Sequence, residues 1–282
     1  MSTKTKQKHS LTTIIIGSII IALIAIVLIM IGLIALVIYI PVRVIVFITN
    51  KTSIVIRRKG KTLYVPVVNL YNKQTRQRIT FLGCIHIGNN GYYRTMEHII
   101  AQHPHATVLC EGTKATFTDQ DKIAKHPYTL LANMMGMVTQ FTMHYQDHWE
   151  YNDYDEKLDQ LSRIMNFFSQ KQKDGKTLEE KFRSMKPKEK EQTGKVLSWV
   201  MMNMTFFSLI GKLRKKKWKQ RVINHAVLDM RNEYAIGQVD KRKDAHIILL
   251  WGAAHYPGMK SLLMKRGFEQ TDCEWIPALT RQ

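Results

Sequence analysis

Two histidines and one glutamate in this chain stand where apolar, strand-like segments end. His86 and His255 each close a Gly-x-x-His motif that continues an apolar run, and Glu111 directly follows the run Ala106–Cys110. Ligands of open α/β sheets bind beyond the carboxyl ends of the strands. We therefore expect these three side chains to share one site.

The residue types favour a metal site. Neutral imidazole binds borderline transition metals and a carboxylate adds a hard oxygen ligand, so the set suits a divalent ion such as Mn, Co or Zn. Gly83 and Gly252, which open the two motifs, lack a Cβ and permit a sharp exit from the strand. One Gly-x-x-His motif is more often part of a core or rim, but two copies with a third strand-end residue favour a shared site.

Other polar candidates receive simpler interpretations. His144 and His148 have the i, i+4 spacing of one helix face but lack the His-Glu-x-x-His arrangement, so a solvated polar face is favoured. Cys84 and Cys110 are expected to be small buried hydrophobes beside the site, and a cysteine nucleophile is the lesser alternative.

The surrounding patterns predict an α/β fold with a largely parallel central sheet, flanking helices and a long helical insertion at about 116–225. Short apolar runs are typical of strands buried on both faces. The segments predicted as strands are Lys61–Leu70, Arg78–Ile85, Ala106–Cys110 and His246–Leu250, and those predicted as helices are Tyr93–Ala101 and Met259–Arg266.

The N-terminal region predicts a membrane anchor. Residues 11–40 form one apolar run, longer than the about 20 residues that span a bilayer as a helix. A basic tail (1–10) precedes this single-pass span, and a β-rich connecting or hairpin region (41–77) separates it from the main domain (78–282). Basic residues flank both ends of the span and favour, by a small margin, a cytoplasmic domain.

The chain has 282 residues and carries 42 Lys and Arg against 22 Asp and Glu, a formal net charge of +20. This excess favours anionic partners. No nucleic-acid recognition motif accompanies it, so specific nucleic-acid binding is not expected. The apolar stretch Val196–Ile210 and the basic cluster after it are interpreted by default as a core or partner-facing helix with a solvated face, although a helix lying on anionic lipid is an alternative.

The motifs together resemble the TraB/PrgY–GumN–Tiki superfamily. The resemblance covers about residues 78–268 and includes the order of the motifs. It rests on the two Gly-x-x-His motifs, Glu111-Gly112 between them, Arg231-Asn232 upstream of the second motif, and the stretch from Gln140 to Asp153.

This resemblance implies a metal-dependent hydrolase, with peptidase activity in the Tiki branch, on a fold related to erythromycin esterase and ChaN. His86, His255 and Glu111 would bind the metal, Glu111 acting as ligand or general base, and Arg231 would hold an anionic group. Gly83, Gly252, Asn232, Gln140 and Asp153 would support the site. The alternative for Arg231 is a surface ion pair with Asp229 or Glu233.

The expected partners are the bilayer and a peptide or protein substrate, and self-association into a homo-oligomer stays open. A rival function is a non-catalytic, membrane-tethered protein of the same fold that binds a peptide or regulates a partner.

Overall fold

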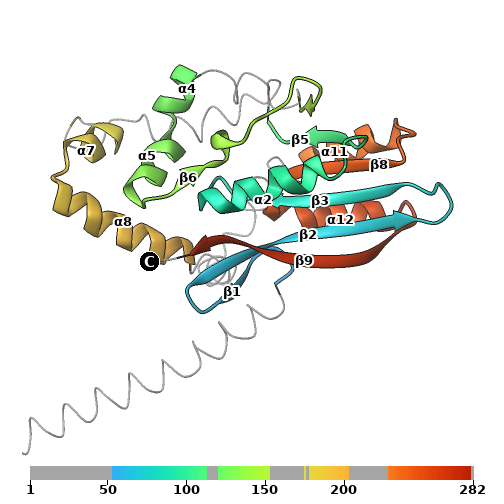
Figure 1. The fold of residues 1–282 in the computed structure, drawn as a ribbon, viewed down its shortest axis with the longest axis horizontal. Helices are drawn as coiled ribbons and strands as arrows, with labels where there is room; N and C mark the ends of the chain where they lie inside the picture. Colours follow the sequence, from blue (N-terminus) through green and yellow to red (C-terminus); the bar gives the residue numbers. More distant parts are fainter. Residues whose placement is uncertain (1–52, 113–119, 153–174, 176–177, 203–227, 281–282) are drawn as a thin grey trace, which may run out of the picture. The chain divides into compact units, whose positions relative to one another are not determined.

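The structure, a computed structural model, describes residues 53–112, 120–152, 175, 178–202 and 228–280 (Figure 1). All of them belong to one compact unit, Asn50–Gln282. The predicted basic tail and membrane anchor, 1–10 and 11–40, lie outside the described residues. Within the described ranges, no helix is long and apolar enough to cross a membrane.

Four parallel strands form the centre of the sheet. Their order is β3 (Arg78–Cys84), β8 (His246–Gly252), β5 (Thr107–Cys110) and β7 (Glu150–Tyr151). Strand β8 lies between β3 and β5, and its apolar residues from 247 to 251 are at most 3% exposed. A continuous apolar run is what burial on both faces requires. The α/β class and the parallel central strands are therefore confirmed.

An antiparallel extension continues the same sheet. Strand β2 (Thr62–Asn72) pairs with β3 on one side and with β9 (Phe268–Thr280) on the other, and the short β1 (Arg57–Lys59) pairs with its first residues. Strand β9 was not predicted. The first half of its sequence is mostly polar and the second half contains Pro277, which is tolerated in a strand at the edge of a sheet.

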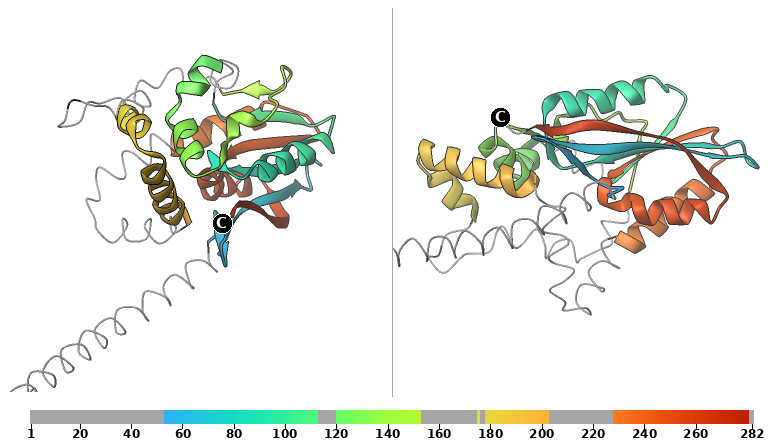
Figure 2. Two further views of the ribbon diagram at one scale, coloured as in Figure 1. Left: turned by 60° about the vertical axis from the view of Figure 1, so that its left-hand side comes forward. Right: turned by 90° about the horizontal axis from the view of Figure 1, so that it is seen from below.

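Helices cover both faces of the sheet (Figure 2). Helix α2 (Asn90–Ala101) buries Tyr92, Met96 and Ile100 against one face. Helices α11 (Met230–Asp240) and α12 (Tyr256–Met264) pack against the other face. Alternate residues of β3, β8 and β5 thus belong to two core clusters, one on each face of the sheet.

Where the structure describes it, the predicted helical insertion is only partly helical. Its described helices are α4 (Gln120–Lys125), α5 (Pro127–Met134), α7 (Leu178–Ser184) and α8 (Pro187–Met202). Between α5 and α7, however, the chain forms the short strand β6 (Val138–Thr139), the 3-10 turn η1 (Gln140–Thr142) and β7. Strand β6 pairs with β4 (Ile87–Gly88), directly after His86. This pairing brings the insertion to the end of β3.

Candidate functional site

Three neighbouring parallel strands end on the same side of the sheet. Strand β3 ends at Cys84, β8 at Gly252 and β5 at Cys110. Glu111 continues directly from β5, and His255 closes the 3-10 turn η4 (Ala253–His255) that follows β8. The fold thus brings the second Gly-x-x-His motif and the strand-end glutamate together.

The Glu111 carboxylate is the centre of this cluster. Its Oε1 lies 2.8 Å from Nη2 of Arg231 and 3.3 Å from Nε2 of His255. Its Oε2 accepts a hydrogen bond of 2.5 Å from the backbone N–H of Gly252. One side chain therefore connects the ends of β5 and β8 with the first turn of α11.

These contacts keep Glu111 ionised. Burial alone would raise its pKa, but the hydrogen bond and charge of His255, the charge of Arg231 and the Gly252 N–H together lower the pKa well below 4.5. A general base works best when its pKa lies near the working pH. Of the two roles predicted for Glu111, ligand or general base, its environment therefore favours the ligand.

His255 is buried and held from both sides. It is 3% exposed, and its Nδ1 lies 2.7 Å from Oδ1 of Asn232. Its ring and the Trp251 ring are nearly perpendicular, with a centroid distance of 5.4 Å. Asn232, included in the prediction only through the resemblance, is thus a direct partner of His255. A Cβ at Gly258 would lie 2.2 Å from the Asn232 amide nitrogen, so a glycine is needed there.

Arg231 is a buried residue of the cluster. It is only 6% exposed and pairs with Glu111, so the alternative that placed Arg231 at the surface is wrong. Its guanidinium also lies 5.8 Å from the centre of the Trp251 ring. Arg231 thus holds an anionic group in this structure, the Glu111 carboxylate.

The motif glycines serve different contacts. A Cβ on Gly252 would lie 2.9 Å from Oε2 of Glu111, inside the site. A Cβ on Gly83 would instead lie 2.9 Å from the carbonyl oxygen of Pro66 in β2. Gly252 therefore allows the carboxylate to approach the backbone, whereas Gly83 allows two strands to pack.

His86 lies at the edge of the cluster and is solvent-exposed. Its Nδ1 is 3.2 Å from Oε1 of Gln140, and its ring stacks on Tyr128. Desolvation by the surrounding protein lowers the pKa of His86, and the opposing charges of Glu111 and Arg231 also act on it. Gln140 is thus a partner of His86, as its inclusion in the prediction suggested.

The donor atoms around Glu111 fit a divalent metal in part. The His255 ring can donate Nδ1–H to Asn232 and offer its Nε2 lone pair, the usual arrangement of a metal-bound histidine. The 3.3 Å between Nε2 and Oε1 of Glu111 matches two ligands bonded at about 2.0–2.1 Å to one tetrahedral ion. Among the described residues no three His, Cys, Asp or Glu side chains form a group that could hold a metal. His255 and Glu111 fit such an ion, and His86 would have to move closer to complete the set.

The remaining predicted residues are one aspartate, two histidines and two cysteines. Asp153 lies outside the described residues. His144 and His148 lie in irregular chain before β7, so the helix face assumed from their spacing does not exist. Cys84 and Cys110 are buried as expected, and burial raises the pKa of both thiols.

Sequence reasoning missed two aromatic neighbours of the site. Tyr128 stacks on His86, and the buried indole of Trp251 packs against His255, its Nε1 having no hydrogen-bond partner in the described part of the chain. Trp251 directly precedes the second motif glycine and could have been noticed there. No local pattern marks Tyr128, because a tertiary contact brings α5 to the end of β3.

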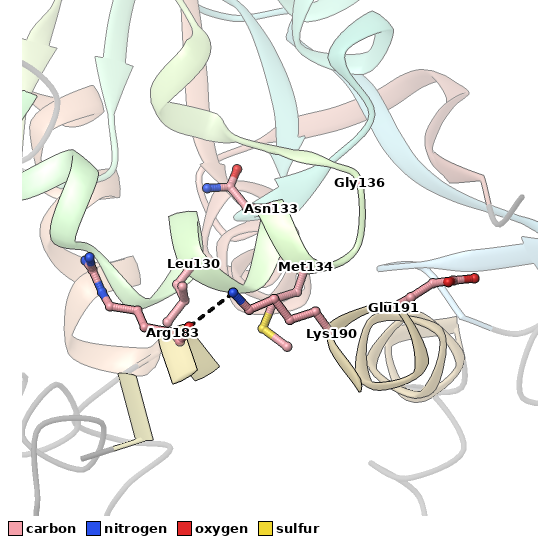
Figure 3. A pocket seen from close by; sticks show the side chains of 7 residues that line it. All are labelled: Leu130, Asn133, Met134, Gly136, Arg183, Lys190 and Glu191. Carbon is pink, nitrogen blue, oxygen red and sulfur yellow. Dashed lines mark hydrogen bonds between the residues drawn. The ribbon is translucent and has the colours of Figure 1, made fainter. Parts of the chain in front are cut away.

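Two sizeable cavities lie away from the cluster. One, of about 580 Å³, is lined by residues of α5, α7 and α8 and by Gly136, with Lys190 donating to the Arg183 carbonyl across it (Figure 3). The other, of about 450 Å³, lies between α2 and the chain before β7 and includes His103, His144 and His148. None of the predicted site residues lines either cavity.

Comparisons of the chain with protein-family models, curated proteins and solved structures find no match.

Proposed function

We propose that the protein is a metal-dependent hydrolase of the peptidase type, tethered to a membrane by residues 11–40. The observation that carries the proposal is the buried network at the carboxyl ends of β5 and β8. There Glu111 pairs with Arg231, contacts His255 and accepts a hydrogen bond from the Gly252 N–H, while Asn232 orients the other side of the His255 ring. Buried networks that fix a carboxylate beside an imidazole are typical of metal and catalytic sites.

Each residue has a role that follows from its environment. His255 and Glu111 would hold the ion, with His86 as the third ligand. A bound Mn, Co or Zn ion lowers the pKa of its water and polarises a carbonyl. Arg231 keeps the Glu111 carboxylate ionised and oriented, and Asn232 keeps the His255 ring in one orientation. These contacts hold the site in place before substrate arrives.

The substrate class follows from the predicted anchor and from the charge. A domain tethered by residues 11–40 acts on molecules near the membrane surface, and a net charge of +20 attracts acidic ones. We expect peptides or membrane-proximal proteins with acidic segments to be the substrates.

One observation favours the rival function, a non-catalytic peptide-binding regulator. Arg231 lies 2.8 Å from the same Glu111 oxygen that a metal would need, so the ion pair competes with the ion. Structural ion-pair networks also shift pKa values, so the low pKa of Glu111 does not require catalysis.

Metal content separates the two functions. The full-length protein is purified in detergent, and its metal is measured by elemental analysis before and after dialysis against Mn, Co or Zn. A hydrolase should retain about one equivalent, and His255→Ala and Glu111→Gln should lose it. His144→Ala, which removes an exposed histidine outside the cluster, is the matched control.

Activity is then assayed on a library of acidic peptides with the retained metal. Metal-dependent cleavage that is lost in His255→Ala and kept in His144→Ala supports the hydrolase. Peptide binding without metal retention or cleavage would establish the regulator instead.

A further inference from the structure

The His86 ring is one end of a series of aromatic contacts. Its ring and that of Tyr128 stack at 4.6 Å between centroids, with an interplanar angle of 16°. Tyr128 also contacts the His126 ring at 4.9 Å, and His126 meets Phe141 at 4.9 Å. Tyr128, His126 and Phe141 thus form an aromatic cluster, and the exposed His86 imidazole stacks on its Tyr128 ring.

Tyr128 is itself firmly placed. It lies in the first turn of α5, and its backbone N–H donates to Nδ1 of His126, the N-cap residue, at 3.2 Å. Its ring packs against the core cluster that contains Ile87, Ala132 and Leu279. A capped helix end and a hydrophobic cluster therefore determine where the Tyr128 ring lies.

Gln140 provides a second constraint on His86. Its Oε1 lies 3.2 Å from Nδ1 of His86 and 3.4 Å from the Cys84 thiol, and its backbone N–H donates to the His86 carbonyl at 3.1 Å. With a carbonyl oxygen as partner, Nδ1 carries the proton in the neutral ring. The Nε2 atom is then left with a bare lone pair.

We infer that Tyr128 is a positioning residue for His86. Its ring fixes the plane of the imidazole, Gln140 fixes Nδ1, and Nε2 is presented as the free acceptor atom of the site. Free histidine favours the opposite tautomer, with the proton on Nε2, so the protein selects the rarer form. The part of this inference that concerns catalysis rests on the proposed function, whereas the orientation of His86 does not.

The stacked ring rather than the hydroxyl carries the effect. The Tyr128 hydroxyl makes no hydrogen bond to any residue in the described ranges. Tyr128→Phe keeps the ring and is the matched control, while Tyr128→Leu removes the stack. Should the Leu variant fail to fold, Tyr128→Met fills the same space with a flexible chain and no ring.

The test is the tautomer of His86 in the full-length protein, measured at one fixed pH in detergent. Two-bond ¹H–¹⁵N spectra of protein with ¹⁵N-labelled histidine distinguish protonated from bare ring nitrogens, and His86→Gln assigns the signal. The expected result is Nδ1–H with bare Nε2 in the wild type and in Tyr128→Phe, and a mixture of tautomers in Tyr128→Leu or Tyr128→Met. An unchanged tautomer in both ring-less variants, or an equal change in Tyr128→Phe, would overturn the inference.

Turnover adds a separate readout. Loss of a residue that orients a ligand typically costs about 10–100-fold in activity. Tyr128→Leu should lower kcat by about that factor with little change in KM, and Tyr128→Phe should remain near wild type. A tautomer effect in a protein that hydrolyses nothing would contradict the proposed function and leave the positioning role intact. Metal-dependent cleavage with an unchanged His86 tautomer in the ring-less variants would support the proposed function and contradict the positioning role of Tyr128.

Discussion

The two Gly-x-x-His motifs have the same spacing in the sequence and different surroundings in the fold. After β8, a 3-10 turn leads into α12 and carries His255 back into the core, where Asn232 and Glu111 hold it. After β3, the chain continues into β4 and pairs with β6, so His86 stays at the surface against Gln140 and Tyr128. The spacing places a histidine near a strand end, but the element that follows decides whether it is buried.

The largest expected effect comes from breaking the buried cluster. In Glu111→Gln the buried charge of Arg231, whose side chain is 8% exposed, loses its ion pair with Glu111. Removing one partner of a buried ion pair typically costs about 3–5 kcal/mol. Urea unfolding should show a loss of this size. A loss below about 1 kcal/mol would mean that the cluster contributes little to the fold.

Acid should weaken the same cluster. The pKa of Glu111 is lowered in the folded state relative to its unfolded value of 4.5, so its stabilisation is present above that pH. It is lost as the pH falls from 4.5 through the lower, folded-state pKa. The stability gap between wild type and Glu111→Gln should therefore shrink as the pH falls below about 4.5. A gap that widens in acid would contradict the assigned direction of the shift.

The motif glycines allow a finer comparison. An added methyl in a packed site typically costs about 1–3 kcal/mol. Gly252→Ala puts its Cβ 2.9 Å from Glu111 and Gly83→Ala puts it 2.9 Å from the Pro66 carbonyl, so both should be destabilised by similar amounts. Only Gly252→Ala should alter metal retention, measured by elemental analysis. Equal loss of metal in both variants would mean that the two glycines act in the same way.

The two histidine variants are expected to lose the least stability. The losses should still differ, because His255 is buried and His86 is exposed. His255→Ala leaves the buried Asn232 side chain without a partner, at a typical cost of about 1–3 kcal/mol. His86→Ala removes an exposed ring, and changes at such positions usually stay within about 0.5 kcal/mol. Thermal melts of the two variants, with His144→Ala as an exposed control, test this difference. Equal losses would remove the distinction between the two motifs.

Local sequence predicted the features that depend on local pattern. The apolar run 247–251 identified the central strand β8, and the strand-end positions of Glu111 and His255 follow from their place directly after such runs. The edge strand β9 was missed because only one of its faces is buried and its polar residues hide the pattern. Tyr128 was missed because its contact with His86 depends on how α5 packs, which no local spacing encodes.

The pairing of β2 with β9 has a consequence for biosynthesis. The hydroxyls of Thr62 and Thr280, 218 residues apart, lie 3.2 Å from one another at one end of this pair. At about 5–20 residues per second, the ribosome needs roughly 10–40 s between the two strands. Throughout that interval β2 has an unpaired edge, and such edges are prone to wrong pairing. Until β9 has emerged, the nascent chain should therefore need a chaperone to protect this edge, unless its aggregation is slower than translation.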